Sequence, residues 1–211
     1  MSIVTKLIDF ILHVDKYLSL VVSQYGILTY LILFIVVFCE TGLVFTPFLP
    51  GDSLLFISGT FAANGALNVF LLWIVFALAA ILGDSANYFI GSFFGEKVFT
   101  KIKFFRQDYL DKTKKFYEKY GVKTIIIARF VPIVRTFAPF VAGVGKMDYK
   151  KFFLYNIIGG LLWVTLILFA GFYFGKIDWV EKNLTLITYL IIVISILPVI
   201  IEVVRSKFMK S

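Results

Sequence analysis

Two stretches of the chain place charged residues, prolines and small residues inside otherwise apolar runs. The first, residues 40–52, carries only acids, Glu40 and Asp52. The second, residues 129–139, carries only bases, Arg129 and Arg135. Irregular backbone at membrane depth survives only where it is buried in protein or lines a water-filled cavity. A matched pair of interrupted apolar segments is therefore typical of a transporter's binding site.

The composition indicates an integral membrane protein. Of the 211 residues, 60% are hydrophobic and 16% charged, whereas a soluble domain is about half apolar and a quarter charged. Residues 152–175 carry no charge, and such a run is long enough to cross ~30 Å of hydrocarbon. The single cysteine, Cys39, excludes an internal disulfide. With one histidine and no cluster of Cys or His, the sequence predicts neither a metal site nor a cofactor.

An internal repeat organises the chain. Shifted by 80 residues, residues 65–68 align with 145–148, and residues 91–95 align with 171–175. In each copy we expect a glycine to end one segment and Asn68 or Asp148 to cap the next helix. That helix ends in GxxxG, which lets another helix approach closely. Chance matching of glycine and phenylalanine in an apolar chain is the alternative.

The interrupted segments predict re-entrant hairpins. The arms 27–39 and 53–64 would each cover roughly 20 Å as helices, too little to cross a bilayer. The second hairpin, 121–145, is expected to turn near Pro132 to Pro139, because proline removes a backbone donor and disfavours helix in the residue before it. The predicted hairpin breaks are Pro47, Pro50, Gly51, Pro132 and Pro139.

The predicted fold class is an all-α integral membrane protein. It has two re-entrant helical hairpins in an inverted-topology repeat, three full transmembrane helices and amphipathic interfacial helices. We expect one membrane domain over residues 1–211. Its segments are an amphipathic helix at 1–24, repeat 1 at 27–95, a basic interfacial connector at 97–120, repeat 2 at 121–175 and a C-terminal transmembrane helix at 184–207.

Lys and Arg side chains predict the orientation. In this topology 15 of them fall on the side that holds the 97–123 connector and the C-terminus, and four fall on the other side. Basic residues stay cytoplasmic, so we expect the connector and the C-terminus in the cytoplasm. The connector interleaves Phe and Tyr with Lys and Arg, which predicts an interfacial helix at anionic headgroups. An ordinary solvated face is the alternative. Nucleic acid is excluded by the membrane setting.

Four ionisable side chains lie at or near the hairpin tips: Glu40, Asp52, Arg129 and Arg135. A charge at the centre of a membrane helix costs about 2.5–3.5 kcal/mol. The planar fork of Arg suits phosphate, so we expect the two arginines to bind phosphate. The alternative is that they only neutralise the two acids.

The two acids are candidates for proton or counter-charge carriage, because burial raises a carboxyl pKa and a nearby Arg lowers it. The alternatives are a fixed ion pair for Glu40 and a helix N-cap for Asp52. Asp84 and Tyr88 share a helix face and are expected to form a hydrogen-bonded pair. Asn156 and Trp163 are expected in packing or interfaces. Asp84, Tyr88 and Asn156 are candidates for residues that support the site.

The same residues carry a resemblance to the DedA family, whose shared region is called the VTT or SNARE-associated domain. An acid before a Pro-x-x-Pro-Gly-acid turn is matched by Glu40 and residues 47–52. A Gly-Asp-x-x-x-Tyr-x-x-Gly segment is matched by residues 83–91. The third and most specific signature is matched within residues 129–163. The resemblance covers roughly residues 28 to 175, and Gly42, which departs from it, is given no role.

The resemblance implies a bacterial inner-membrane lipid translocase. It implies return of undecaprenyl phosphate, or movement of a phospholipid, between leaflets, with dependence on the proton-motive force. It also implies that Glu40, Asp52, Arg129 and Arg135 are the functional charges. The rivals are a proton-coupled small-ion or solute antiporter of the same fold and a non-transporting membrane assembly protein. The sequence shows no constellation typical of an enzyme, and it is compatible with a homo-oligomer.

The topology is testable by labelling single cysteines at positions 65 and 145 in a chain whose Cys39 is replaced. Inverted repeats place these two positions on opposite sides of the membrane. We therefore expect an impermeant thiol reagent to label one from outside the cell and the other only after permeabilisation. Labelling of both from the same side would refute the inverted topology.

Overall fold

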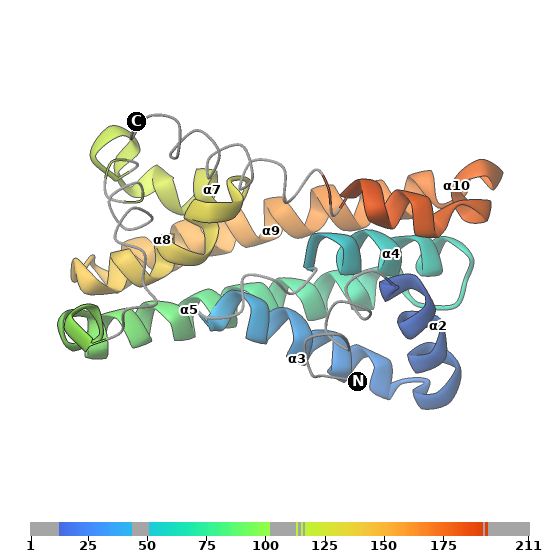
Figure 1. Cartoon of the computed structure of the whole chain (residues 1–211), viewed down its shortest axis with the longest axis horizontal. Coiled ribbons are helices and arrows are strands. Elements are labelled where there is room, and N and C mark those ends of the chain that lie inside the picture. The colour runs from blue at the N-terminus through green and yellow to red at the C-terminus, as the bar shows by residue number, and fades with distance from the viewer. Residues whose placement is uncertain are drawn as a thin grey trace, which may run out of the picture. The chain divides into compact units, whose positions relative to one another are not determined.

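The computed structural model describes residues 13–43, 51–101, 113, 115, 117–191 and 193 of the chain, and all regular elements in these residues are helical. This agrees with the predicted all-α class. The elements, shown in Figure 1, are α2 (Val14–Tyr25), α3 (Leu28–Gly42), α4 (Gly51–Ala63), α5 (Val69–Lys101), the 3-10 helix η1 (Gly121–Lys123), α7 (Thr124–Ala128), α8 (Pro132–Val144), α9 (Tyr149–Phe174) and α10 (Asp178–Lys182).

Two helices are long and apolar enough to cross a membrane: Val69–Phe94 of α5 and Tyr149–Phe174, which is α9. They match the predicted spans closely. Helix α3 is apolar but shorter, as expected for a hairpin arm. Of the predicted C-terminal span, the structure describes only residues 184–191 and 193. Re-entrance of the hairpins and the third span stay predictions, and most of the 97–120 connector lies outside the described residues.

Both predicted helix caps are present. The Asn68 side-chain oxygen accepts hydrogen bonds from the backbone N–H groups of Phe70 and Leu71, each at 3.0 Å, at the start of α5. At the start of α9, Asp148 Oδ1 accepts one from the Lys151 N–H at 3.0 Å. Polar side chains at this position satisfy N–H groups that a helix leaves unpaired. The two long helices therefore begin in the same way.

The turns before these caps differ at one position. Gly65 has a positive φ of 79°, as a glycine that ends a helix often does. In the second copy the residue with positive φ is Lys146, at 51°, and not Gly145. Gly145 nevertheless follows the last residue of α8, Val144, so the expectation that a glycine ends this segment is confirmed. A lysine tolerates the left-handed region less well than glycine does.

The helices group into two compact units. Unit 1 comprises Met1–Phe34, Leu49–Phe76 and Val164–Ser211, and unit 2 comprises Ile35–Phe48 and Ala77–Trp163. Three helices, α3, α5 and α9, contribute residues to both units. Unit 1 thus takes α4 from the first predicted repeat and the C-terminal part of α9 from the second.

In unit 1, α4 packs closely on the C-terminal part of α9. A methyl group built on Gly59 would lie 2.3 Å from the Leu168 carbonyl oxygen, and one built on Gly171 would lie 2.0 Å from the Phe56 carbonyl oxygen. Two helix backbones can come this close only where both faces lack side chains. Helix α2 also packs against α4 in this unit.

In unit 2, α8 packs on α5 through the same arrangement. A methyl group on Gly143 would lie 2.0 Å from the Tyr88 carbonyl oxygen, and one on Gly91 would lie 2.2 Å from the Phe140 carbonyl oxygen. The first glycine of each GxxxG, Gly91 or Gly171, therefore lies against the helix predicted to be the second arm of a hairpin, α8 or α4.

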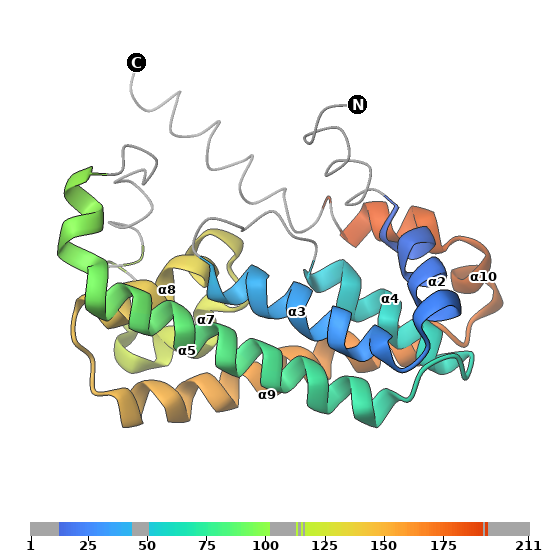
Figure 2. The ribbon, with the colours of Figure 1, turned by 90° about the horizontal axis from the view of Figure 1, so that it is seen from below.

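Gly42 has a packing role that the sequence did not reveal. A methyl group there would lie 3.2 Å from the Gly83 carbonyl oxygen. The end of α3 consequently lies against the backbone of α5 (Figure 2).

The proline breaks correct one expectation. The second hairpin breaks at residues 129–131, before Pro132, which is the first residue of α8 and follows an extended Val131. Proline suits this first position because its missing N–H is not needed there. Pro139 lies inside α8 and is not a break. Gly51, predicted as a break, is the first residue of α4. Pro47 and Pro50 lie outside the described residues.

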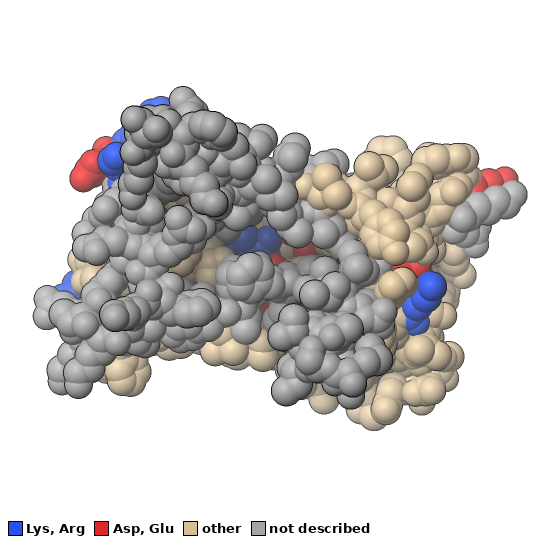
Figure 3. Space-filling view, in the orientation of Figure 1, with Lys and Arg blue, Asp and Glu red and all other residues tan. Residues whose placement is uncertain are grey.

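The surface fits a lipid-facing protein. Large apolar side chains are exposed along the long helices, among them Phe70, Leu78 and Phe93 on α5 and Leu154 and Leu166 on α9. On the face in Figure 3, the described residues are mostly uncharged, and Lys, Arg, Asp and Glu gather in few places.

The close approach of α8 to α5 can be tested with Gly143→Ala. The new methyl group would overlap the Tyr88 carbonyl, so α8 must move. We expect the free energy of unfolding in detergent to fall by about 1–3 kcal/mol. The measurement is the unfolding temperature, which should fall with it. The matched control is Gly145→Ala, whose methyl group would lie 3.3 Å from its nearest atom. Equal stability of the two variants would contradict this packing.

Candidate functional site

Three of the four predicted charges belong to unit 2. Glu40 lies in the last turn of α3, Arg129 lies in the break between α7 and α8, and Arg135 lies in the first turn of α8. Asp52 belongs to unit 1, and its convergence with the other three stays a prediction. It is the second residue of α4 rather than the cap, a position where a negative charge stabilises the helix N-terminus.

Arg129 is buried and held at one nitrogen. Only 4% of the residue is exposed. Its Nη2 lies 2.5 Å from Asp84 Oδ2 and 2.5 Å from Asn156 Oδ1. The two partners come from α5 and α9, so the break of the second hairpin is tied to both long helices. The acid paired with Arg129 is thus Asp84, whereas the sequence suggested Glu40 or Asp52.

Two glycines of α9 make room for this side chain. A methyl group on Gly159 would lie 3.2 Å from Arg129 Nε, and one on Gly160 would lie 3.5 Å from Nη2. Both glycines share a helix face with Asn156, because residues three and four apart are neighbours. The pattern Asn-x-x-Gly-Gly at residues 156–160 could have indicated that a polar side chain from another helix packs on this face of α9.

Asn156 is therefore more than a packing residue. It is fully buried. Its oxygen accepts a hydrogen bond from Arg129, and its Nδ2 donates to the Ile81 carbonyl at 2.9 Å. The amide uses both of its functions, which fixes its orientation.

Arg135 is held more loosely. Its Nη2 lies 3.5 Å from Glu40 Oε1, and the two side chains are 12% and 10% exposed. Its Cζ lies over the Trp163 ring, 4.1 Å from the centroid. A desolvated guanidinium over an indole face is attracted to the ring electrostatically. Trp163, expected in packing or an interface, thus also contacts a charged side chain.

The expected pairing of Asp84 with Tyr88 is wrong. The Tyr88 hydroxyl donates to the Met147 carbonyl, and its ring stacks on Phe152 with centroids 4.6 Å apart. A buried carboxylate needs a charged partner far more than a phenol does. Arg129 supplies that partner from a distant part of the sequence, which spacing along one helix could not reveal.

Asn87 is a site residue that the sequence analysis missed. It is fully buried, and its Nδ2 donates to the carbonyl oxygens of Thr41 at 3.1 Å and Thr136 at 3.0 Å. Thr41 lies at the end of α3, where carbonyls lack helical partners. Thr136 lies inside α8. One amide therefore connects the helices that carry Glu40 and Arg135.

Tyr117 forms a hydrogen bond to the backbone of α8. Its hydroxyl donates to the Ala138 carbonyl at 2.9 Å. Burial, and after it the charge on Asp84, raise the pKa of this phenol above its ordinary value. The hydroxyl consequently stays protonated and remains a donor.

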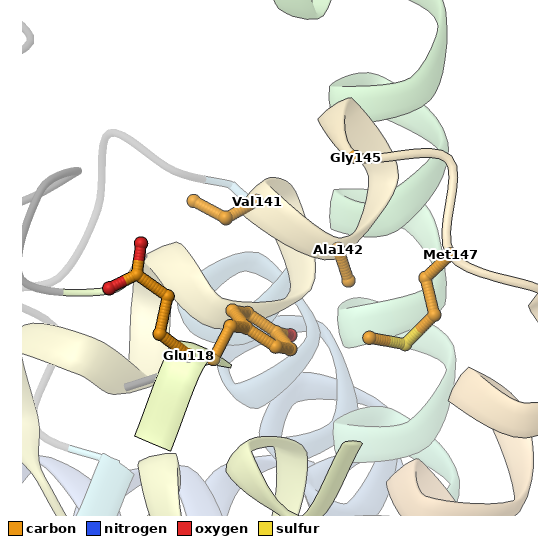
Figure 4. A pocket seen from close by; sticks show the side chains of 6 residues that line it. Glu118, Val141, Ala142, Gly145 and Met147 are labelled. Atoms are coloured by element: carbon orange, nitrogen blue, oxygen red, sulfur yellow. The ribbon is translucent and has the colours of Figure 1, made fainter. Parts of the chain in front are cut away.

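A cavity of about 340 Å³ lies beside Tyr117. Its lining is mostly apolar and consists of Tyr117, Glu118, Val141, Ala142, Gly145 and Met147, as Figure 4 shows. None of the paired charges lines it. The cavity is therefore separate from the charged site, although both use α8.

The arrangement suits an anion. Arg129 lies within electrostatic reach of Arg135 and of Glu40 as well as Asp84, so four charges share one apolar unit. Arg129 Nε and Nη1 are buried and have no hydrogen-bond partner among the described residues. Buried N–H groups nearly always have partners, and oxygens of an anion are chemically suitable ones.

Comparisons with known proteins agree with the resemblance. Residues 49–173 match the family described as the VTT domain. The chain is 57% identical over 211 residues to Protein DedA of Escherichia coli K12, covering 98% of this chain and 96% of that protein. It is 43% identical over 175 residues to the uncharacterized membrane protein Rv0364 of Mycobacterium tuberculosis H37Rv, covering 81% and 77%.

A third relative is the inner membrane protein YqjA of E. coli K12. It is 33% identical over 156 residues, covering 73% of this chain and 70% of that protein. No solved structure matches the chain.

Proposed function

Because the chain belongs to the DedA family of membrane proteins, we propose that it moves a phosphate-bearing lipid, undecaprenyl phosphate or a phospholipid, between the leaflets of the membrane. The observation that carries the proposal is the pair of arginines in unit 2, one of which keeps two buried nitrogens without a partner among the described residues. Guanidinium groups bind phosphate through charged, directional hydrogen bonds.

Arg135 is the principal headgroup ligand in this proposal. Its contact with Glu40 is longer than that of Arg129 with Asp84, 3.5 Å against 2.5 Å, and its side chain is more exposed. The longer and less buried of the two ion pairs is the easier one to exchange. Arg129 adds a fixed positive charge and further donors, while the lipid tail stays in the bilayer.

Charge balance connects transport to protons. Arg129, Arg135, Asp84 and Glu40 sum to zero, so an arriving phosphate adds uncompensated negative charge to a buried site. A proton on Glu40 removes one negative charge and releases Arg135 to the headgroup. Asp52 is proposed as the second carrier of a proton or counter-charge, delivered from the other hairpin. The proton-motive force would then drive the cycle.

The two predicted repeats would provide alternating access by moving against one another. In this proposal the protein acts in the bacterial inner membrane, the membrane that the name of YqjA gives for that relative, with the 97–123 connector and the C-terminus in the cytoplasm. The assembly-protein rival is disfavoured, because Gly91 and Gly171 of the GxxxG faces already receive α8 and α4 of the same chain.

Replacing the arginines should abolish transport. We expect Arg135→Ala to lower the flux of a labelled undecaprenyl phosphate in proteoliposomes at least about tenfold, because a charged hydrogen bond contributes about 1.5–3 kcal/mol. Arg129→Ala should do the same, and Arg135→Lys should be intermediate, since Lys cannot form a fork. The matched control is Lys151→Ala, an exposed base of α9.

Unchanged flux in Arg135→Ala would refute the site. Flux of a labelled phospholipid, measured in parallel, separates the two lipid classes. Movement of small ions or solutes without any phosphate lipid would instead favour the antiporter.

Glu40→Gln should uncouple flux from the proton gradient. The amide is nearly isosteric with the protonated acid and cannot release a proton. We expect an imposed pH gradient to accelerate lipid flux in the wild-type protein and to have little effect in the variant. Glu118→Gln, an exposed acid on the rim of the cavity near Tyr117, is the control. A variant that still responds fully to the gradient would exclude a proton role for Glu40.

A further inference from the structure

The Arg129 guanidinium is held in an unusual way. Asp84 Oδ2 and Asn156 Oδ1 both lie 2.5 Å from the same nitrogen, Nη2. That nitrogen carries two N–H groups, and two acceptors therefore use both. The other nitrogens, Nε and Nη1, are buried and lack hydrogen-bond partners among the described residues. Among the described residues, only Nη2 of the guanidinium has hydrogen-bond acceptors, and Nε and Nη1 have none.

The acceptors come from two rigid elements. Asp84 lies on α5 and Asn156 on α9, both fixed by the packing of these long helices. The Asn156 amide is itself oriented by the Ile81 carbonyl, which also accepts a hydrogen bond from Ser85 at 2.8 Å. Gly159 lets the Arg129 side chain lie directly on α9. Each acceptor is therefore placed before any ligand arrives.

We infer that Asp84 and Asn156 form a positioning clamp, which fixes Nη2 of Arg129 so that its remaining donors meet the oxygens of a phosphate headgroup. This inference rests on the proposed function and deepens it. The two clamp residues act through Arg129 and need no contact with the lipid. Arg135, held by Glu40 and Trp163, is the arginine that exchanges partners, while Arg129 stays in place.

The clamp also explains why the paired groups differ chemically. One carboxylate is enough to balance the charge of Arg129. The second acceptor needs to be neutral, because a second carboxylate would add a negative charge and repel the headgroup. An amide at position 156 accepts from Arg129 without adding charge. The inference therefore predicts that the acid and the amide can be exchanged between the two helices.

The test is the exchange of these two side chains. Four proteins are compared in proteoliposomes with the labelled undecaprenyl phosphate: wild type, Asp84→Asn, Asn156→Asp and the double variant D84N/N156D. We expect each single change to raise the lipid concentration that gives half-maximal flux at least about tenfold, since a displaced ligand-binding group costs up to about 100-fold. The double variant should return to within a few-fold of wild type.

A purely structural role gives a different result. It would lower the amount of folded protein and the unfolding temperature, both measured in detergent, without changing the half-saturating lipid concentration of the folded fraction. Asp148→Asn, at the N-cap of α9, is the control for a lost acid outside the site.

Two outcomes would overturn the clamp alone: unchanged half-saturation in Asp84→Asn, or a double variant that is no better than the single ones. Absence of lipid flux in the wild-type protein would overturn the proposed function, and the headgroup role of the clamp with it.

Discussion

The buried charge of Arg129 constrains the rest of unit 2. A guanidinium that is 4% exposed in an apolar protein requires a charged partner and further hydrogen bonds. Asp84 and Asn156 supply both, and they must project from two helices toward one nitrogen. Gly159 makes room for this side chain, because a methyl group there would lie 3.2 Å from Arg129 Nε. Arg129 itself follows the last residue of α7, and the chain is extended at Val131 before α8 begins at Pro132. The buried charge thus lies where the helix is interrupted.

The same packing arrangement occurs twice, and the copy in unit 2 lies beside two ion pairs, Arg129–Asp84 and Arg135–Glu40. In unit 1, α4 lies against the C-terminal part of α9, and in unit 2, α8 lies against α5, each through one glycine on either helix. The positions that match Asp84 and Asn87 under the 80-residue shift are Val164 and Ile167. Close helix packing is thus a property of the repeat, whereas the charged site is an addition to one copy.

Local pattern was sufficient for much of the fold. Apolar length predicted the two long helices, and Asn68 and Asp148 predicted their first residues, because caps depend on a few neighbouring groups. The cost of charge in a membrane pointed to Glu40, Arg129 and Arg135 without any structure. The partners of these charges were not predictable in the same way. Asp84 shares a helix face with Tyr88 but pairs with Arg129, which is distant in sequence. Nothing in the sequence around Asn87 indicates that its side chain donates to two carbonyl groups of other helices. Pro139 shows that one missing hydrogen bond does not end a helix that is held by tertiary contacts.

The two ion pairs of unit 2 differ in length and in burial. Under the proposed function, the site cannot hold both arginines equally tightly, because the headgroup would have to displace an existing partner. The Arg129 pair is short, doubly accepted and almost fully buried, so breaking it would leave two uncompensated charges in an apolar interior. The Arg135 pair is longer and partly exposed, and Trp163 keeps the guanidinium in place when Glu40 leaves it. The difference between the two pairs therefore gives the site one fixed charge and one that can change partners.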